Sequence, residues 1–212
     1  EAKTMLRDGR KLASLSAQLP VSEHMRFLRI LGEEIQVIAE EMEASILMET
    51  GKPDSLCKVE TAKGLKWLAH AFKNAETQID GLRPMGVTQV IESFNYPFAI
   101  AMAGIVGALA SGNSVIIAGA DKASAWLYHF MDAAKKAIDR FHLDEKLVGR
   151  EFAENYDKLK HALIQFNIGI TPRITRNANV VHFVGSEATG MKIKELRGNK
   201  RTIIEMGGPN TV

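Results

Sequence analysis

The sequence predicts an α/β fold, a Rossmann-like parallel sheet flanked by helices, with a helical N-terminal layer. Residues 86–121 follow the order strand, turn, apolar helix, turn and second strand. Residues 180–206 repeat the order strand, helix, strand, whereas residues 1–79 show helical patterns alone. We therefore expect one domain, with a helical layer over residues 1–80 and βα units over residues 86–212.

Three helices are expected in the N-terminal layer. Residues 1–19 form the first, which Pro20 ends. Val21 to Thr50 is predicted to be one helix, because apolar residues recur there at spacings of three and four and glutamates cover the other face. A third helix is expected from about Ser55 to Ile79, and Gly81 to Pro84 then turns the chain into the first strand.

The stretch from Gly86 to Asp121 supplies the first two strands. Val87 to Ile91 is β-branched enough for a strand, and Asn95-Tyr96-Pro97 breaks it. The following helix, Phe98 to Ala110, is apolar on every side, so we expect it to be buried against the sheet. Gly112-Asn113 ends this helix, and the continuous apolar run Ser114 to Ile117 is typical of a central parallel strand.

The remaining elements alternate between helices and strands. We expect helices over Ala123–Phe141, over 143–163 and from Ser186 to near Gly198, strands within 163–170, over Val180–Val184 and over Arg201–Met206, and a polar loop over Thr171–Asn179.

Composition narrows the function classes. Hydrophobic content of 46%, charged content of 25% and a net charge of +2 are ordinary for a globular protein and favour neither nucleic acid nor an anionic membrane as a partner. The longest apolar run is interrupted at Ser111-Gly112-Asn113, which leaves segments too short to cross a bilayer. A single cysteine excludes an internal disulfide and suits a reducing compartment, so we expect a cytoplasmic protein.

Several reactive side chains carry no prediction of chemistry. Cys57 has no histidine placed to activate it, and the six histidines have no metal-ligand spacing, so we expect no metal. The basic residues near the end of the chain are expected to form a solvated helix face: Lys192, Lys194, Arg197, Lys200 and Arg201.

Asn95 lies in the turn that leaves the first strand. A carboxamide there can donate an N–H to an oxygen that gains charge in a tetrahedral intermediate. The alternative is an asparagine that forms the turn by bonding its own backbone before Pro97, and spacing alone favours this alternative.

Gly185-Ser186 joins a strand to a helix. Free N–H groups at a helix start favour a phosphate, and a glycine lets it approach closely. Alternatively, Ser186 is only a helix N-cap, and Glu187 in the first turn would repel a phosphate. Met191 replaces the lysine of a P-loop, and no GxGxxG is present.

Glu205 ends the last strand, beside Gly207-Gly208. A carboxylate in this position has access to a cleft and could act as a general base. On its own, such a residue is more often a solvated acid.

Together these positions resemble the aldehyde dehydrogenase superfamily. Its motifs are similar to four segments, GVTQVIESFNYP (86–97), GALASGNSVI (107–116), VHFVGSEATG (181–190) and EMGG (205–208), and the helix-ending ETGKP (49–53) is similar as well. The resemblance runs from about residue 20 to the end, and it implies that 1–212 is the N-terminal, cofactor-binding portion of such a protein.

The resemblance also implies roles for single residues. Asn95 would be the side-chain oxyanion donor and Glu205 the general base of an NAD- or NADP-dependent aldehyde oxidation. The cofactor cleft would be lined by the backbone of Ile91, Glu92, Ser93 and Phe94 and by Asp121, Phe183, Gly185, Ser186, Met206 and Gly207. The implied partners are a small aldehyde and, at the protein level, a second copy of the chain or a separate catalytic portion.

Two departures from the family pattern keep alternatives open. Ala118 stands where the family has a ribose-binding lysine, and Asp121 is one carbon shorter than the usual acid. A non-catalytic relative that acts as a structural or partner-binding protein is therefore one alternative, and an acylating or acyl-phosphate reductase is another. In this family the catalytic nucleophile is a cysteine that lies beyond the matched segments. We therefore expect this chain alone not to oxidise an aldehyde.

Overall fold

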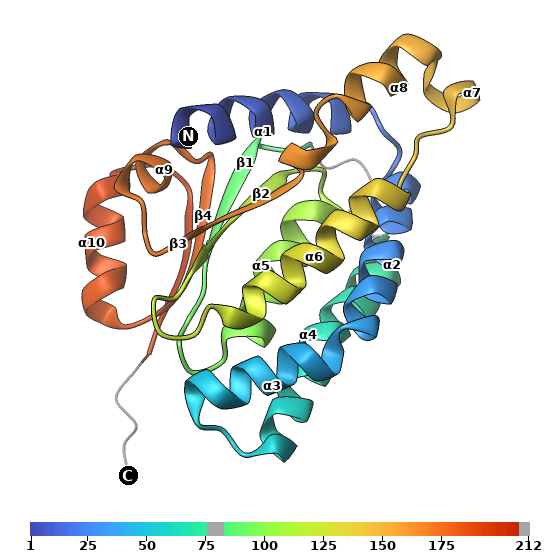
Figure 1. The fold of residues 1–212 in the computed structure, drawn as a ribbon. Coiled ribbons are helices and arrows are strands. Elements are labelled where there is room, and N and C mark those ends of the chain that lie inside the picture. Colours follow the sequence, from blue (N-terminus) through green and yellow to red (C-terminus); the bar gives the residue numbers. More distant parts are fainter. Residues whose placement is uncertain (76–82, 208–212) are drawn as a thin grey trace.

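The computed structural model describes residues 1–75 and 83–207 and confirms the predicted parallel sheet (Figure 1). Its five strands lie in the order β3-β2-β1-β4-β5, and every pair is parallel. The strands are β1 (Val87–Ile91), β2 (Ser114–Gly119), β3 (Ile164–Ile168), β4 (Val180–Gly185) and β5 (Thr202–Met206). Because all run in one direction, their carboxyl ends meet along one edge of the sheet.

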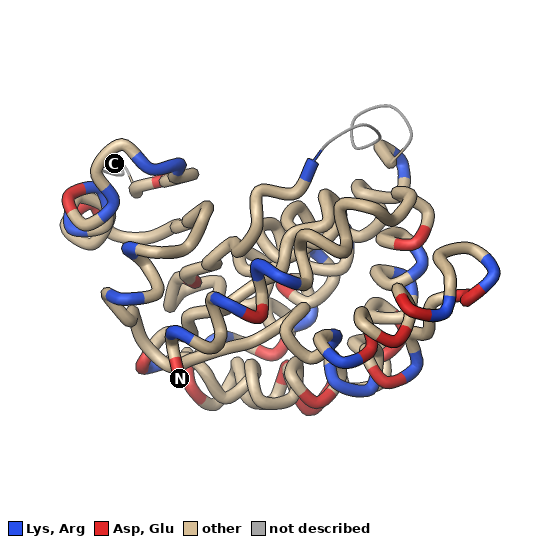
Figure 2. Tube along the Cα trace, turned by 90° about the horizontal axis from the view of Figure 1, so that it is seen from above, with Lys and Arg blue, Asp and Glu red and all other residues tan. Residues whose placement is uncertain are grey.

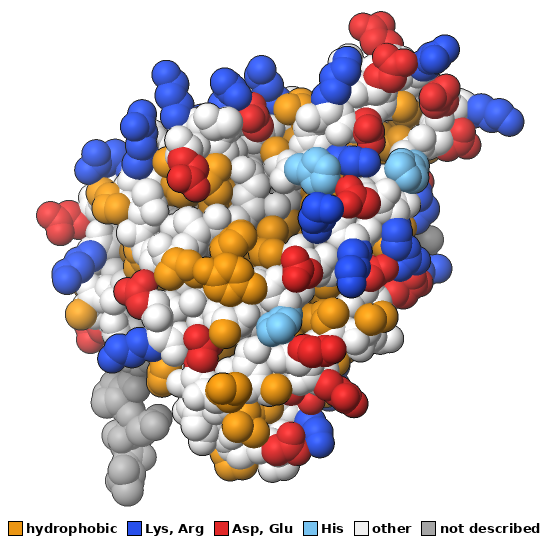
Figure 3. Space-filling model, in the orientation of Figure 1, with side chains coloured by type: hydrophobic (Ala, Val, Ile, Leu, Met, Phe, Trp, Pro, Cys, Tyr) orange, Lys and Arg blue, Asp and Glu red, His pale blue; other side chains and the backbone are white. Residues whose placement is uncertain are grey.

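Helices cover both faces of this sheet. They are α1 (Ala2–Ser16), α2 (Val21–Val37), α3 (Ala39–Thr50), α4 (Asp54–Asn74), α5 (Pro97–Ala110), α6 (Ala125–Arg140), α7 (Glu145–Val148), α8 (Arg150–Asp157), the 3₁₀ turn η2 (Lys160–Ala162), α9 (Pro172–Asn177) and α10 (Glu187–Arg197). In Figure 1, α5 and α6 lie on one face beneath α2, α3 and α4, while α9 and α10 lie on the other face. The helix α1 crosses the amino edge of the strands, where Lys and Arg side chains stand out along it (Figure 3).

The side chains of the central strands alternate between two cores, as a strand period of two requires. Val90, Val115 and Ile117 belong to the larger core beneath α5 and α6. Val87 and Ile91 belong to the smaller core beneath α1, α9 and α10. The helix α5 carries no charged residue and is the apolar centre of the molecule, whereas charged residues follow the outer helices (Figure 2).

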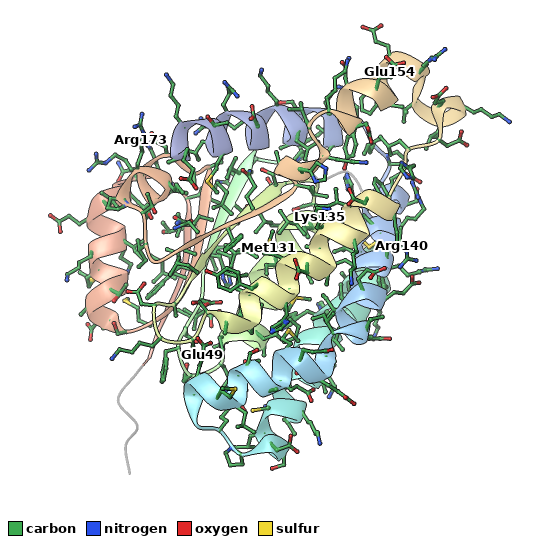
Figure 4. The ribbon with its side chains drawn as sticks, viewed as in Figure 1. Glu49, Met131, Lys135, Arg140, Glu154 and Arg173 are labelled. Atoms are coloured by element: carbon green, nitrogen blue, oxygen red, sulfur yellow. The ribbon has the colours of Figure 1, made fainter. Side chains whose placement is uncertain are left out.

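The helix α6 is tied to the N-terminal layer at both of its ends (Figure 4). At its start, the Glu49 carboxylate accepts a hydrogen bond of 2.7 Å from the backbone N–H of Ala125. At its end, Arg140 forms an ion pair of 2.9 Å with Glu33 of α2. The predicted helical layer therefore packs on the sheet's own helices and shares their core.

The prediction of one helix from Val21 to Thr50 is wrong in one respect. The chain leaves the helical conformation at Ile38 (φ −104°, ψ 14°), which separates α2 from α3. Val37 and Ile38 are β-branched residues of low helix propensity, so the break falls where the helix is intrinsically weakest. Both helices pack on α6, and the apolar spacing continues across the break.

The predicted polar loop over Thr171–Asn179 is also wrong, because it contains α9. This short helix starts at Pro172 and buries Ile174 and Thr175. Six residues with one large apolar side chain show no periodicity that a sequence pattern could reveal. The predicted helix over 143–163 is broken into α7, α8 and η2, with Gly149 at a positive φ of 81°.

The other boundaries agree with prediction within a few residues. The strand β1 spans the predicted residues, and α6 buries Trp126, Phe130, Ala134 and Ile138. Ile79, the expected end of the third helix, lies outside the described residues. No helix in the part of the chain that the structure describes is long and apolar enough to span a membrane.

Candidate active site

The carboxyl edge of the sheet brings the predicted site residues together. The strand order reverses direction between β1 and β4, since β2 and β3 follow on one side of β1 and β4 and β5 on the other. Ligands of open α/β sheets bind in the crevice at such a switch point. The turn after β1, the β4–α10 junction and the end of β5 all lie at this edge.

Asn95 lies in the turn between β1 and α5, and side chains of neighbouring segments bind the end of that turn. The fully buried carboxylate of Glu60 accepts hydrogen bonds from the first N–H groups of α5, at 2.9 Å from Phe98 and 3.3 Å from Ala99. Lys52 pairs with the other oxygen of Glu60, and its ammonium lies 4.2 Å from the centre of the Tyr96 ring. These contacts fix where α5 begins, and therefore where the turn can run.

The Asn95 side chain itself is free. It is exposed and makes no hydrogen bond to another described residue. The alternative interpretation, an asparagine bonded to its own backbone, is therefore not what the structure shows. An exposed carboxamide on a turn held by Glu60 is available to donate to a ligand.

Glu92 and Ser93 are buried at the end of β1, and sequence reasoning named them only as backbone lining. One carboxylate oxygen of Glu92 accepts a hydrogen bond of 2.6 Å from the backbone N–H of Ala120. The other oxygen has no partner among the described residues. Burial raises the pKa of Glu92 to about 9, with a smaller opposing effect from the Ala120 N–H. The Glu92 carboxyl is therefore protonated at neutral pH. The only signal in the sequence was an acid directly after an apolar strand.

At the β4–α10 junction, the hydroxyl of Ser186 caps the helix by accepting a hydrogen bond of 3.3 Å from the backbone N–H of Thr189. The N-cap interpretation of Ser186 is thus correct. Helix geometry leaves the N–H groups of Glu187 and Ala188 without intrahelical acceptors, so both interpretations of this junction can hold together. Gly185 is required by packing, since a Cβ there would lie 2.6 Å from the ring of Phe183.

Glu205 is exposed on β5, opposite Val184 of β4. It lines an open groove of about 810 Å³, whose other wall is formed by α4 and α5. Tyr96, the neighbour of Asn95, lines the same groove. The groove is bounded by Lys63, Lys66, Trp67, His70, Tyr96, Ala99, Ile100, Ala103, His182, Val184, Ile203 and Glu205.

The other predicted cofactor residues divide into exposed and buried ones. Phe94 and Asp121 are exposed at the edge, and Gly207 donates its N–H to the Gly185 carbonyl at 3.1 Å. Ile91 and Phe183 are buried beneath α10, where Met206 packs against Gly190. They can support the edge but do not present their side chains to it.

Ala118 is buried within β2, between Ile91 and Asn167 on the neighbouring strands. It belongs to the core beneath α1 and α10, so this position offers no cation to a ligand. Asp121 follows it on the exposed turn after β2.

Two further expectations about reactive side chains can be compared with the structure. Cys57 is fully buried on α4, and burial raises the pKa of its thiol, as expected for a structural cysteine. In the described ranges 1–75 and 83–207, no group of three His, Cys, Asp or Glu side chains could hold a metal ion.

The expectation of a solvated basic cluster near the C-terminus is wrong for Arg197. Its guanidinium is buried and donates to the backbone carbonyls of Thr175, Ala178, Asn179 and Arg201. It thereby ties α9, α10 and β5 together at the amino edge of the sheet. The other four residues of the cluster are exposed: Lys192, Lys194, Lys200 and Arg201.

Comparisons with known proteins agree with this arrangement. The chain is 22% identical to the lactaldehyde dehydrogenase of Methanocaldococcus jannaschii, over 99% of this chain and 46% of that protein. It is 27% identical to the 2,5-dioxopentanoate dehydrogenase of Saccharolobus solfataricus, over 92% of this chain and 42% of that protein.

A solved structure has the same fold. The glyceraldehyde-3-phosphate dehydrogenase of Methanocaldococcus jannaschii, complexed with NADP, superposes with a TM-score of 0.82 at 19% identity, over 98% of this chain and 46% of that one. The chain therefore spans about half the length of the relatives that it matches. A sequence model of the aldehyde dehydrogenase family matches residues 1–212, and we conclude that this chain belongs to the aldehyde dehydrogenase family.

Proposed function

We propose that this chain is the cofactor-binding part of an NAD(P)-dependent enzyme that oxidises an aldehyde to a carboxylic acid. One observation carries the proposal: Tyr96, which follows Asn95, and Glu205, from a different strand, line the same groove. In this proposal the oxyanion donor and the general base reach the same reacting carbon, and the groove shared by Tyr96 and Glu205 supports it.

In this proposal the two exposed polar groups have separate roles. The Asn95 amide donates a hydrogen bond to the aldehyde oxygen as it gains negative charge in the tetrahedral intermediate. Loss of a hydride from this intermediate leaves a thioester. Glu205 then removes a proton from the water that hydrolyses the thioester. Cys57 is buried and does not supply the thiol. The thiol belongs to the half of the family's length that this chain does not span.

The residues at the carboxyl edge fit a dinucleotide. The buried Ser93 hydroxyl has no partner among the described residues, and the start of α10 offers two free N–H groups beside Ser186. When bound, NAD(P)+ would supply the hydride acceptor. The apolar Ala118 argues for a weakened ribose contact, which favours the alternative of a non-catalytic relative that binds a partner.

A titration separates these two possibilities. We expect NAD+ or NADP+ to bind this chain saturably in calorimetry, with a micromolar dissociation constant. The Glu187→Gln variant should bind two- to fivefold more tightly, roughly the effect of one charge at a helix N-terminus, because Glu187 repels the phosphates.

Glu195→Gln is the matched control, since Glu195 is exposed in the last turn of the same helix. It should leave the dissociation constant unchanged. Absence of saturable binding by both dinucleotides would contradict the proposed function and support the non-catalytic alternative. Equal effects of the two substitutions would remove α10 from the binding site.

The proposal includes a protein partner. Parallel strands are normally covered on both faces, yet Ile203 of β5 is 52% exposed on the face opposite α10. This face carries the groove and Glu205. A catalytic portion of about the chain's own size, or a second copy, would cover it.

We also propose a cytoplasmic location, which the buried and unpaired Cys57 supports.

A further inference from the structure

His182 is the one histidine of β4, and it lies in the middle of the strand between Val90 of β1 and Ile203 of β5. Its ring rests on Gly104 of α5, because a Cβ on that glycine would be only 2.9 Å from the His182 Nδ1. Gly104 therefore makes the room in which an imidazole fits between the helix and the sheet. No sequence pattern singles out either residue.

The His182 ring is mostly buried, and its Nδ1 has no hydrogen-bond partner among the described residues. Burial lowers the pKa of His182, and the nearby negative charge of Glu205 raises it by a smaller amount. The ring is therefore neutral at physiological pH and has an unoccupied nitrogen. Such a group can accept a proton.

Glu205 and His182 project from the same face of adjacent strands. Ile203 is opposite His182 and Val184 is opposite Glu205, so the two residues are diagonal neighbours on adjacent strands, with Cα atoms about 8 Å apart. Both side chains line the groove described above.

His182 also lines a second cavity of about 570 Å³, which continues along the same sheet face toward the amino edge. Ala103 and Ile203 are shared by both cavities, and polar residues of the amino edge, including Thr88 and Asn113, line the second one. His182 thus stands between the groove that holds Glu205 and the second cavity.

We propose that His182 is a proton-relay residue that returns Glu205 to its ionised form. The inference rests on the proposed role of Glu205 as the general base. Water gives a proton to the Glu205 carboxylate while its hydroxide adds to the thioester carbonyl and the thiolate leaves. The proton then passes from Glu205 to the His182 imidazole, through a bridging water, and from the imidazole to water in the second cavity.

Among the described residues that line the two cavities, Glu205 is the only acid. On the groove side, α4 contributes Lys63, Lys66 and His70, while α5 contributes none. In the second cavity the charged groups are Arg83 and Arg201. Burial lowers the pKa of His182, and Glu205 is the charge that opposes this effect.

The coupling can be measured in this chain by following the His182 ring signals against pH by NMR, with His182→Gln to assign them. We expect the His182 pKa to fall by about 0.4 units in Glu205→Gln, the value for one charge at about 8 Å in water. Glu195→Gln, on the opposite side of the sheet, should cause no shift. A His182 pKa that is identical in both variants overturns the relay, whether or not the chain binds a dinucleotide.

In the active enzyme, His182→Gln is expected to slow steady-state turnover about tenfold or more while the first burst of NAD(P)H stays unchanged. Imidazole added to the buffer should restore turnover. A burst that is lost together with turnover, without rescue by imidazole, would assign His182 to structure and overturn the relay. Failure of the proposed function appears separately, as an absence of dinucleotide binding in the titration.

Discussion

The two edges of the parallel sheet are built differently. At the amino edge, the Asn113 side chain accepts hydrogen bonds from the N–H groups of Met85 and Gly86, at 2.6 and 3.0 Å. The side-chain NH₂ of Asn113 also donates a hydrogen bond of 2.9 Å to the hydroxyl of Ser111. Arg197 donates to four backbone carbonyls at the same edge. The polar side chains of this edge are used to close the fold.

At the carboxyl edge, polar atoms remain without partners among the described residues. They include one oxygen of Glu92, the Ser93 hydroxyl and the side-chain oxygen of Asn167. Asn95 and Glu205 are exposed and likewise unbonded.

The amino edge also has atoms without partners among the described residues, the Ser114 hydroxyl and the Arg197 Nε. At the carboxyl edge, however, the unpaired buried groups lie beside exposed polar side chains, an arrangement that favours a ligand or a proton-transfer role. The amino edge thus carries side chains that bridge separate segments, and the carboxyl edge carries side chains left available for binding.

Arg197 offers the sharpest test of this difference. Arg197→Met keeps the length of the side chain but leaves four carbonyls without their donor. We expect the free energy of unfolding to fall by about 3 kcal/mol, as is typical when a buried hydrogen-bonded charge is removed. Urea denaturation followed by circular dichroism measures the change.

Lys194→Met is the control for the loss of one positive charge on the same helix. Lys194 is exposed, so this substitution should change the free energy of unfolding by less than about 0.5 kcal/mol. Equal effects of the two substitutions would show that Arg197 does not hold the amino edge.

The same contrast explains how much of the fold could be predicted from the sequence. Regular patterns gave β1, α5, β2, α6, β4 and α10, because burial on one or both faces forces a repeat on the sequence. The break at Ile38 and the helix α9 were missed, since each depends on a few residues whose conformation is set by packing partners far away in the chain. The sequence suggested that Arg197 is a surface cation, because the backbone carbonyls that it binds lie in segments separated from one another along the chain.

The candidate site was predictable only where its residues lie at strand ends. Asn95 and Ser186 follow strands and Glu205 lies near the end of β5, so the topology of a parallel sheet brings them to one edge. Glu60 and His182 could not be found in this way. Glu60 acts from α4 on the start of α5, and His182 depends on the absence of a side chain at Gly104. Such roles arise from three-dimensional neighbours and leave no local pattern.

Glu92 should make the carboxyl edge sensitive to pH. Its pKa is about 9 in the folded chain against 4.5 for a free side chain, so between these values the folded state binds more protons than the unfolded state. Stability contributed by Glu92 is complete below pH 4.5 and is lost as pH rises toward 9. The loss is at most about 1.4 kcal/mol per pH unit.

Glu92→Gln removes this titration and keeps an acceptor for the Ala120 N–H. Comparing urea denaturation at pH 6 and pH 8.5, we expect the wild-type chain to lose 1 to 3 kcal/mol more stability than the variant, roughly. The exposed Glu40→Gln should behave as the wild type does. Parallel pH profiles for the wild type and Glu92→Gln would mean that the carboxyl is already ionised at neutral pH.

The smallest effect on stability is expected at the residues proposed to do the chemistry. Asn95→Ala and Glu205→Gln should each change the free energy of unfolding by less than about 0.5 kcal/mol, because both side chains are exposed and unbonded in the described structure. A matched comparison is Asn113→Ala, which removes the same carboxamide from the amino edge and leaves two N–H groups without an acceptor, a loss of about 2 kcal/mol. If Asn95→Ala destabilised the chain as much as Asn113→Ala does, Asn95 would be a structural turn residue and the two edges would not differ in kind.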